Sequence, residues 1–395
     1  MNSGKMADAV PHLSLTVEEH SVIEGALEIL QIIRPNWQSS DIRCKFFTDG
    51  ITNKLVGCFY EPSQNNIVDT PSTQSIISSD GSNGSNGSTG SLSDAKLDNN
   101  VVLVRVYGHK TDLLIDRGKE IENILLLHKY GLAPALYATF ENGMAYAYEA
   151  GVTLTPDTCK DDDIWPLVAC RMAQMHKKVP TGKVQFERPV LQGKVYQFLE
   201  LVPERFTDPI INDRVWQTFP CPSDLRLEFD ILYARLQDIP SPVVFCHNDL
   251  LLGNVIYDKD HEKVSFIDYE YAGVNHQAFD IGNHFAEFAG IDEIDYERYP
   301  SREFQLRWLT EYLLEYHGYD KYLPGKVEDE AEYLYVQVNQ YALAAHFMWA
   351  VWALVQAEHS AIDFDYVRFA EARFLEYRRN MEIFFELQLP DWYPE

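Results

Sequence analysis

The sequence has few basic residues and no regularly spaced cysteines. Its 395 residues include 33 Lys and Arg against 60 Asp and Glu, a formal net charge of -27. The chain as a whole therefore lacks the attraction to phosphate backbones that nucleic-acid binding needs, and we expect no nucleic-acid partner. The six cysteines form no C-x-x-C pair and no zinc-type spacing. This excludes a disulfide scaffold and a zinc module, and it favours a reducing, cytoplasmic location.

Long apolar runs are also missing. The longest, residues 342–357, contains His346 and is shorter than the roughly 20 residues that a membrane-spanning helix needs. The first residues show no apolar stretch typical of a secretory signal, so we expect no stable membrane insertion. Apolar residues as such are plentiful at 46%, enough for a large buried core. The acidic balance favours the approach of a small cationic substrate.

The first 150 residues predict a small sheet with two helices. Thr16 and Glu19 form a capping box that predicts the start of the first helix, and Gly131 predicts the end of the second. Asp49-Gly50 is a turn signal between two strand patterns. We predict helices over 22–33 and 116–130 and strands over 43–47, 54–60, 101–107, 135–140 and 144–149.

An insertion at about residues 61–100 interrupts this sheet, and a mainly helical region follows it beyond residue 150. Residues 81–91 are only Gly, Ser, Asn and Thr, too little apolar surface to offset the entropy of ordering, so we predict that the insertion is disordered. Helices are predicted over 164–178, 225–237, 302–317, 327–357 and 366–385, with one short β region at 254–268. The sequence therefore predicts an α+β protein with a small β-sheet lobe (1–150) and a large helical lobe (151–395).

A pattern of polar residues at strand ends predicts phosphoryl transfer. The apolar run 243–246 leads into His247-Asn248-Asp249, Asn254 follows Asp249 at the spacing D-x-x-x-x-N, and Asp268 ends a second pair of strand patterns. Kinase catalytic loops use this spacing, in which the Asp accepts a hydroxyl proton and the Asn holds Mg²⁺. Each residue alone would be an ordinary turn residue. The three together favour metal-assisted transfer of a phosphoryl group.

Longer motifs resemble the choline/ethanolamine kinase family. They occupy residues 247–250, 267–271, 275 and 280–287, and Phe288-Ala289-Gly290 is closest to the ethanolamine kinases. The resemblance spans about residues 46–374. It implies a protein-kinase-like bilobal fold, ATP and Mg²⁺ as cofactors, and phosphorylation of ethanolamine to phosphoethanolamine, the first step of phosphatidylethanolamine synthesis from free ethanolamine. Choline as the acceptor, a homodimer, and a non-catalytic kinase-like scaffold are alternatives that stay open.

The resemblance also implies roles for residues of the nucleotide site. Asp249 resembles the catalytic base, and Asn254 and Asp268 resemble the Mg²⁺ ligands. Residues 49–55 resemble the nucleotide loop and residues 148–151 the adenine-facing hinge. The further residues that the resemblance assigns are Thr52, Asn53 and Arg105 at the phosphates, Glu120 as the helix partner of Arg105, and His247 and Asp280 as supports of the catalytic loop.

Two tryptophans indicate where an amino alcohol binds. Trp349 and Trp352 lie three residues apart on an apolar helix and share a face, where indoles attract an ammonium group by about 0.5 to 2 kcal/mol. Paired Trp on such a helix is more often core packing, but the resemblance implies that both line the acceptor site. It adds Tyr271 and Glu287, with Ile362 and Phe369 as further candidates. These groups suit either ethanolamine, which has N–H donors, or choline, which has none.

Overall fold

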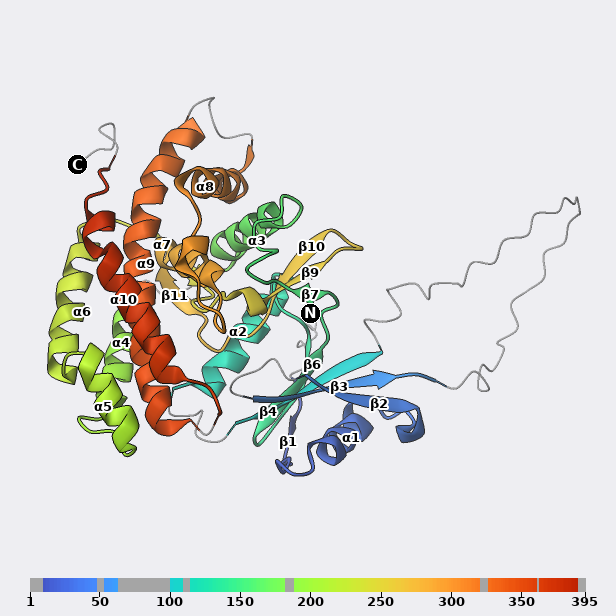
Figure 1. Cartoon of the computed structure of the whole chain (residues 1–395). Helices are drawn as coiled ribbons and strands as arrows, with labels where there is room; N and C mark the ends of the chain where they lie inside the picture. Colours follow the sequence, from blue (N-terminus) through green and yellow to red (C-terminus); the bar gives the residue numbers. More distant parts are fainter. Residues whose placement is uncertain are drawn as a thin grey trace, which may run out of the picture. The chain divides into compact units, whose positions relative to one another are not determined.

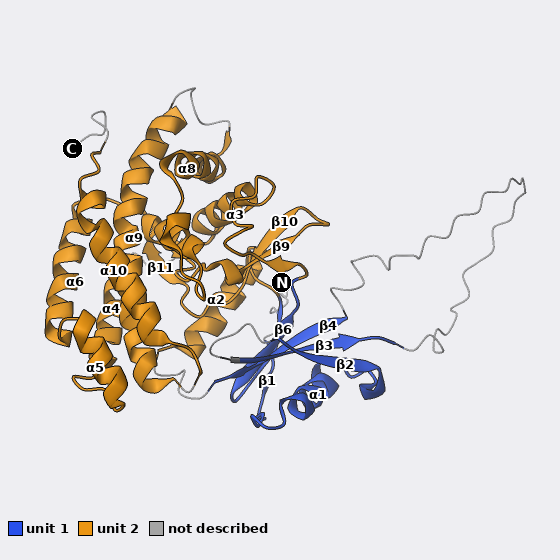
Figure 2. Ribbon diagram, viewed as in Figure 1, with its two compact units in different colours: residues 1–108, 135–149 blue, residues 109–134, 150–395 orange. Residues whose placement is uncertain are grey.

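The computed structural model describes residues 10–47, 53–62, 100–108, 114–181, 188–319, 326–360 and 362–389, with the backbone alone for residue 53. The chain divides into two compact units (Figure 2). Unit 1 comprises residues 1–108 and 135–149, and unit 2 comprises residues 109–134 and 150–395. The helix α2 (Arg117–Lys129) belongs to unit 2, whereas the sequence analysis assigned it to the N-terminal segment.

Unit 1 is a six-stranded sheet in the order β1-β5-β6-β4-β3-β2. The strands are β1 (His12–Leu13), β2 (Ile42–Phe47), β3 (Asn53–Tyr60), β4 (Val101–Tyr107), β5 (Leu136–Phe140) and β6 (Gly143–Ala147). Neighbouring strands are antiparallel except for β1 and β5, so the two predicted hairpins are confirmed. Helix α1 (Val22–Ile33) covers one face (Figure 1) and buries Ile29 and Leu30 in an apolar cluster with Val56 and Val104.

The predicted capping box at the start of α1 is wrong. The helix begins at Val22 after Ser21, whose side chain makes no capping hydrogen bond. The preceding chain is instead held by the β5–β6 turn, where the Asn142 amide accepts from the Val17 N–H at 2.9 Å and donates to the Val17 carbonyl at 2.8 Å. A capping box would have used the backbone N–H groups of Thr16 and Glu19, whereas these tertiary hydrogen bonds hold the backbone of Val17. The local pattern therefore does not decide where the helix starts.

Unit 2 is built around α9 (Lys326–His359), against which α4, α6, α7, α8 and α10 pack (Figure 1). Residues 336–351 of α9 are all buried, as expected for a helix that is apolar on every side. The other helices are α3 (Trp165–Lys178), α4 (Val190–Leu201), α5 (Pro209–Thr218), α6 (Pro222–Gln237), α7 (Gln277–Ala286), α8 (Arg302–His317) and α10 (Tyr366–Phe385). In the described part of the chain, no helix combines the length and apolar character that a membrane crossing requires.

Two small sheets in unit 2 carry the loops that hold the predicted site. One has the order β10-β9-β7, and the other pairs β8 with β11 in antiparallel fashion. The strands are β7 (Val152–Thr153), β8 (Val243–Cys246), β9 (Val255–Asp258), β10 (Lys263–Phe266) and β11 (Gly273–His276). The strand β8 leads into Asp249 and β10 leads into Asp268. The sequence analysis anticipated the β9–β10 hairpin but missed the pairing of β8 with β11 and the helices α4, α5 and α7.

Candidate active site

The three residues of the phosphoryl-transfer pattern lie together at the ends of β8, η5 (Leu252–Asn254, a 3-10 helix) and β10. The Asn254 side-chain amide donates to the Asp249 carbonyl oxygen at 2.9 Å, which leaves its Oδ1 as the atom suited to a cation. The N–H of Ile267, the residue before Asp268, donates to the Asn254 carbonyl at 3.0 Å. Asp249 and Asp268 are both partly exposed. Each can therefore meet a ligand.

A buried carboxylate fixes the loop that carries Asp249. Asp280 lies in the first turn of α7 with no exposed surface, and it accepts from the backbone N–H of His247 at 2.8 Å and of Asn248 at 2.6 Å. Burial opposes its ionisation, but the hydrogen bond from His176 and the charges of His176 and His247 outweigh burial and lower the pKa of Asp280. The loop backbone is thus held by an ionised acceptor, a strong type of hydrogen bond.

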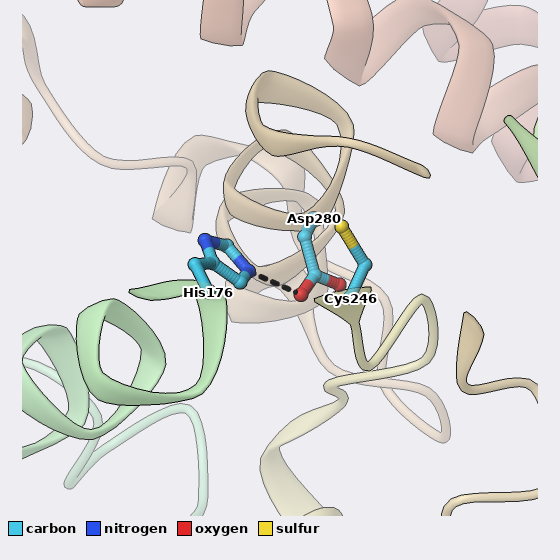
Figure 3. Close-up of side chains that lie close together, drawn as sticks. All are labelled: His176, Cys246 and Asp280. Atoms are coloured by element: carbon cyan, nitrogen blue, oxygen red, sulfur yellow. Dashed lines mark hydrogen bonds and ion pairs between the residues drawn. The ribbon is translucent and has the colours of Figure 1, made fainter. Parts of the chain in front are cut away.

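His176, Cys246 and Asp280 form a compact buried cluster (Figure 3). His176 uses both ring nitrogens, Nε2 on Asp280 at 2.9 Å and Nδ1 on the Tyr312 hydroxyl at 2.7 Å. Burial raises the pKa of the Cys246 thiol well above its usual value, so it stays protonated. Since the nitrogens and carboxylate oxygens already have protein partners, the cluster suits bracing of the loop better than metal binding.

Asn248, which the sequence analysis did not single out, sets the direction of the loop. Its φ is 66°, a left-handed conformation that Asn tolerates better than most residues. Its amide donates to the Tyr271 carbonyl at 3.0 Å and accepts from Asn275 at 2.8 Å. His247 Nε2 meets the Ile267 carbonyl at 2.9 Å. These hydrogen bonds join the Asp249 loop to residues 267–275, the segment that contains Asp268 and the start of β11.

Negative charge is concentrated around Asp249. Burial raises the pKa of Asp249 well above its usual value, and the charges of Asp268, Glu287 and Glu270 raise it further, whereas Arg373 acts in the opposite direction. A carboxylate with a raised pKa is a stronger base. Asp249 lies on the braced loop beside Asn254, and this position makes its carboxylate the candidate acceptor for the proton of a bound hydroxyl.

Asp268 belongs to an acidic cluster, of which the sequence indicated Glu120 and Asp268 but not Glu270. Oxygens of Glu120, Asp268 and Glu270 lie within 4.8 Å of one another, and Arg117 Nη1 pairs with Glu120 at 2.9 Å and with Glu270 at 3.2 Å. Carboxylate and amide oxygens are the ligands that Mg²⁺ prefers, so this donor set together with Asn254 fits that ion. Glu270 follows Asp268 by two residues, a signal that sequence reading could have used.

The predicted phosphate-binding residues of unit 1 are described only in part. Arg105 is buried on β4, and its predicted pairing with Glu120 stays a prediction. Thr52 lies outside the described residues, as does most of the predicted insertion, and only the backbone of Asn53 is described. Tyr148, in the predicted hinge, packs against the rings of Phe47 and Phe59 at 6.3 and 6.2 Å between centroids.

The rings predicted to bind the amino alcohol come together in unit 2. Tyr271 and Trp349 meet edge to face with centroids 5.2 Å apart, and Trp349 and Trp352 do so at 5.6 Å. The Trp352 indole N–H donates to the Tyr271 hydroxyl at 2.9 Å, and that of Trp349 donates to Asn283 Oδ1 at 2.7 Å. Trp352 keeps part of its surface exposed. We call Tyr271, Trp349 and Trp352 the aromatic cluster.

The other acceptor candidates, Phe369, Ile362 and Glu287, have different surroundings. Phe369 packs on Phe364 at 6.0 Å between centroids, and Ile362 is 42% exposed. Glu287 is buried and forms an ion pair with Arg373 of α10. The sequence analysis missed Arg373 because an Arg on an amphipathic helix is usually solvated.

A separate groove of about 730 Å³ lies beside α4 and α6 in unit 2. Gln192, Tyr196 and Tyr233 are among the residues that line it. It contains none of the predicted site residues, and we assign it no role in the chemistry.

Comparison with known proteins identifies the family. The family model described as choline/ethanolamine kinase matches residues 44–378. The chain belongs to this family. An ethanolamine kinase of Drosophila melanogaster is 48% identical over 93% of this chain and 79% of its own length, and ethanolamine kinase 2 of Homo sapiens is 41% identical over 94% and 84%.

Solved structures of the family share the fold. An ethanolamine kinase of Plasmodium vivax matches with a TM-score of 0.70 at 22% identity, covering 91% of this chain and 89% of its own. A choline kinase of Cryptosporidium parvum matches with a TM-score of 0.66 at 20% identity, covering 91% and 96%. The predicted α+β, protein-kinase-like fold with a small sheet portion and a large helical portion is confirmed.

Proposed function

We propose that this protein phosphorylates ethanolamine with ATP and releases phosphoethanolamine, the first step of phosphatidylethanolamine synthesis from free ethanolamine. The observation that carries the proposal is the arrangement of Asp249, on a braced loop of unit 2, beside Asn254 and Asp268, in a family whose similar animal relatives are named ethanolamine kinases. The aromatic cluster and the surrounding carboxylates suit a small cationic alcohol. A cytoplasmic location and a homodimer are part of the same proposal.

Asp249 acts as the base. It takes the proton of the acceptor hydroxyl, whose oxygen then forms a bond to the γ-phosphorus of ATP while the bond from that phosphorus to the ADP oxygen breaks. The backbone hydrogen bonds to Asp280 hold the Asp249 loop in one conformation, so the carboxylate is oriented before the acceptor arrives. Such preorganisation is a large part of catalysis by phosphotransferases.

Asn254 and Asp268 would hold Mg²⁺, with Glu270 and Glu120 close by. The ion would supply positive charge at the β- and γ-phosphate oxygens. Thr52, Asn53 and Arg105 of unit 1 are proposed to meet the same phosphates, and an Arg suits this because its guanidinium matches phosphate geometry. Arg117 pairs with both Glu120 and Glu270 and so offsets the repulsion between their charges.

Choline is the alternative acceptor, favoured by the aromatic cluster alone. Indole and phenol faces attract a methylated ammonium as well as a primary one. The buried Glu287 suits either cation, because it can accept hydrogen bonds from a primary ammonium and can attract a quaternary one by charge. The similarity to animal relatives named ethanolamine kinases favours ethanolamine.

The test is ADP formation by the purified protein with Mg²⁺ and ATP, comparing ethanolamine with choline at equal concentrations. The proposal expects the higher kcat/KM for ethanolamine. A higher value for choline would replace the acceptor and keep the chemistry. Tight binding of Mg-ATP without turnover of either alcohol would instead favour a non-catalytic scaffold.

A further inference from the structure

Two cysteines, Cys44 and Cys58, lie opposite each other in the sheet of unit 1. They are direct partners in the register of β2 and β3, and their Sγ atoms are 3.8 Å apart. Both are free thiols. In the part of the chain that the structure describes, no other two cysteines are hydrogen-bonded to each other. This pair is therefore the candidate for a covalent bond between sulfur atoms.

The hydrogen-bond pattern of β2 and β3 permits such a bond. The Glu61 N–H donates to the Asp41 carbonyl at 2.8 Å, one position beyond the end of the strand register. Hydrogen-bonded and non-hydrogen-bonded pairs alternate along an antiparallel ladder, so Cys44 and Cys58, three positions further on, form a non-hydrogen-bonded pair. Cα atoms in such pairs are about 4.5 Å apart, within the range of about 4.4 to 6.8 Å that disulfides span.

The two thiols differ in exposure and in acidity. Cys44 keeps part of its surface exposed, whereas Cys58 is fully buried in the apolar cluster that includes residues of α1. The hydrogen bond with Cys58 lowers the pKa of Cys44 against the effect of burial, and the same hydrogen bond and burial raise the pKa of Cys58. Because the thiolate is the reactive form, Cys44 is the thiol that an oxidant meets first.

The position of β2 at the edge of the sheet gives such a bond a structural effect. The strand has a neighbour on one side only, β3 (Figure 1). No residue of β2 is fully buried, whereas six of the seven residues of β4 are. Segments with few buried contacts open more readily than the core. A bond from Cys44 to the buried Cys58 therefore fastens an edge strand to the interior of the sheet.

We propose that Cys44 and Cys58 form a reversible disulfide bond that fastens β2 to β3 when a small-molecule disulfide is in excess. The Cys44 thiolate attacks one sulfur of the oxidant, whose S–S bond breaks and releases one thiolate. Cys58 then gives its proton to solvent, and its sulfur attacks the Cys44 sulfur, which releases the second thiolate. Two electrons pass from the cysteines to the oxidant. An excess of thiol reverses the same steps, so the pair stays reduced in a reducing compartment.

The test exposes the purified chain to mixtures of glutathione disulfide and glutathione and then blocks the remaining thiols by alkylation. Mass spectrometry of the intact protein and of its non-reduced peptides identifies each bond. The proteins are wild type, Cys44→Ser and Cys58→Ser. The matched control is Cys221→Ser, because Cys221 is an exposed cysteine of unit 2.

Wild type and Cys221→Ser are expected to yield a linked peptide pair that contains Cys44 and Cys58 and that dithiothreitol separates. Cys58→Ser should stop at the mixed disulfide between Cys44 and glutathione, because the second thiol is missing. Cys44→Ser should leave the buried Cys58 unmodified. In oxidised wild type, the amide hydrogens of β2 that bond to β3 should exchange with solvent about tenfold more slowly, because the bond closes a loop of about 15 residues and restricts its opened state.

Wild type that forms no bond between Cys44 and Cys58 at any ratio of the two glutathione forms would overturn the proposal. A stable glutathione adduct on Cys44 in wild type, or a bond to another cysteine instead, would overturn it as well. Unchanged hydrogen exchange of β2 in the linked protein would refute the fastening of the edge strand. The wild-type measurements decide the matter even if a Ser variant does not fold, and none of them depends on the proposed function.

Discussion

Replacing Asp280 by Asn tests whether this carboxylate holds the catalytic loop. The carboxylate is fully buried and accepts from His247 N–H at 2.8 Å, Asn248 N–H at 2.6 Å and His176 Nε2 at 2.9 Å. Asn has the same shape but presents an NH₂ group to one of these donors. Hydrogen bonds to charged groups contribute about 1.5 to 3 kcal/mol each. Losing one and weakening the others gives a decrease of about 3 to 5 kcal/mol in unfolding free energy, the usual effect of breaking a buried ion pair.

The assay is urea denaturation of Asp280→Asn beside wild type, with Asp213→Asn as the control because Asp213 is an exposed residue of α5. The pKa of Asp280 is lowered in the folded protein, so its contribution is present above the ordinary Asp pKa of about 3.9. It is lost as pH falls through the folded value. The difference between the two proteins should therefore shrink in acid. A decrease below about 1 kcal/mol at pH 7 would contradict this role.

Four other predictions concern packing, the acceptor and the insertion. A Cβ at Gly282 would lie 2.6 Å from a backbone carbonyl of α9, so Gly282→Ala should lower the unfolding free energy by about 1 to 3 kcal/mol in denaturation. At Gly193 a Cβ meets no atom within 4 Å, and Gly193→Ala should raise it by up to about 1 kcal/mol. Trp352→Ala removes a hydrogen bond to Tyr271 and should raise KM for ethanolamine while KM for Mg-ATP stays unchanged. An equal increase of both KM values would show that Trp352 does not act at the acceptor site. Deletion of residues 63–97 should leave steady-state kinetics unchanged, because their composition cannot support a packed core.

The longer helices of unit 2 could be predicted from the sequence, and the shorter α4, α5 and α7 could not. The bounds of α8 and α10 agree with the prediction to the residue, because each alternates apolar and charged residues at helical spacing. Every residue of α7 is buried, including the polar Gln277, Asp280 and Asn283, so its polar residues do not mark a solvated face, and Gly282 in its middle reads as a helix breaker. The predicted capping box at Thr16 failed because the helix starts later, at Val22, and the chain at Val17 is hydrogen-bonded to Asn142.

The candidate site, too, could be predicted from the sequence only in part. Asp249, Asn254 and Asp268 could be found because their spacing along the chain is fixed by the chemistry that they share. Arg373 and His176 act through partners that are distant in sequence, Glu287 and Asp280. Nothing in their local pattern distinguishes them from solvated residues. Tertiary packing brings them to the site, since α3 and α7 both pack on β8, and α10 and α7 both pack on α9.

The most direct test of the account is identification of the product by ³¹P NMR after incubation with Mg²⁺, ATP and ethanolamine. The account predicts a phosphomonoester resonance of phosphoethanolamine that grows as ADP forms. With Asp249→Asn, which keeps the fold, the rate should fall by about two to four orders of magnitude. ADP formation without phosphoethanolamine, or an equal rate in the variant, would contradict the assignment of Asp249 as the base of an ethanolamine kinase.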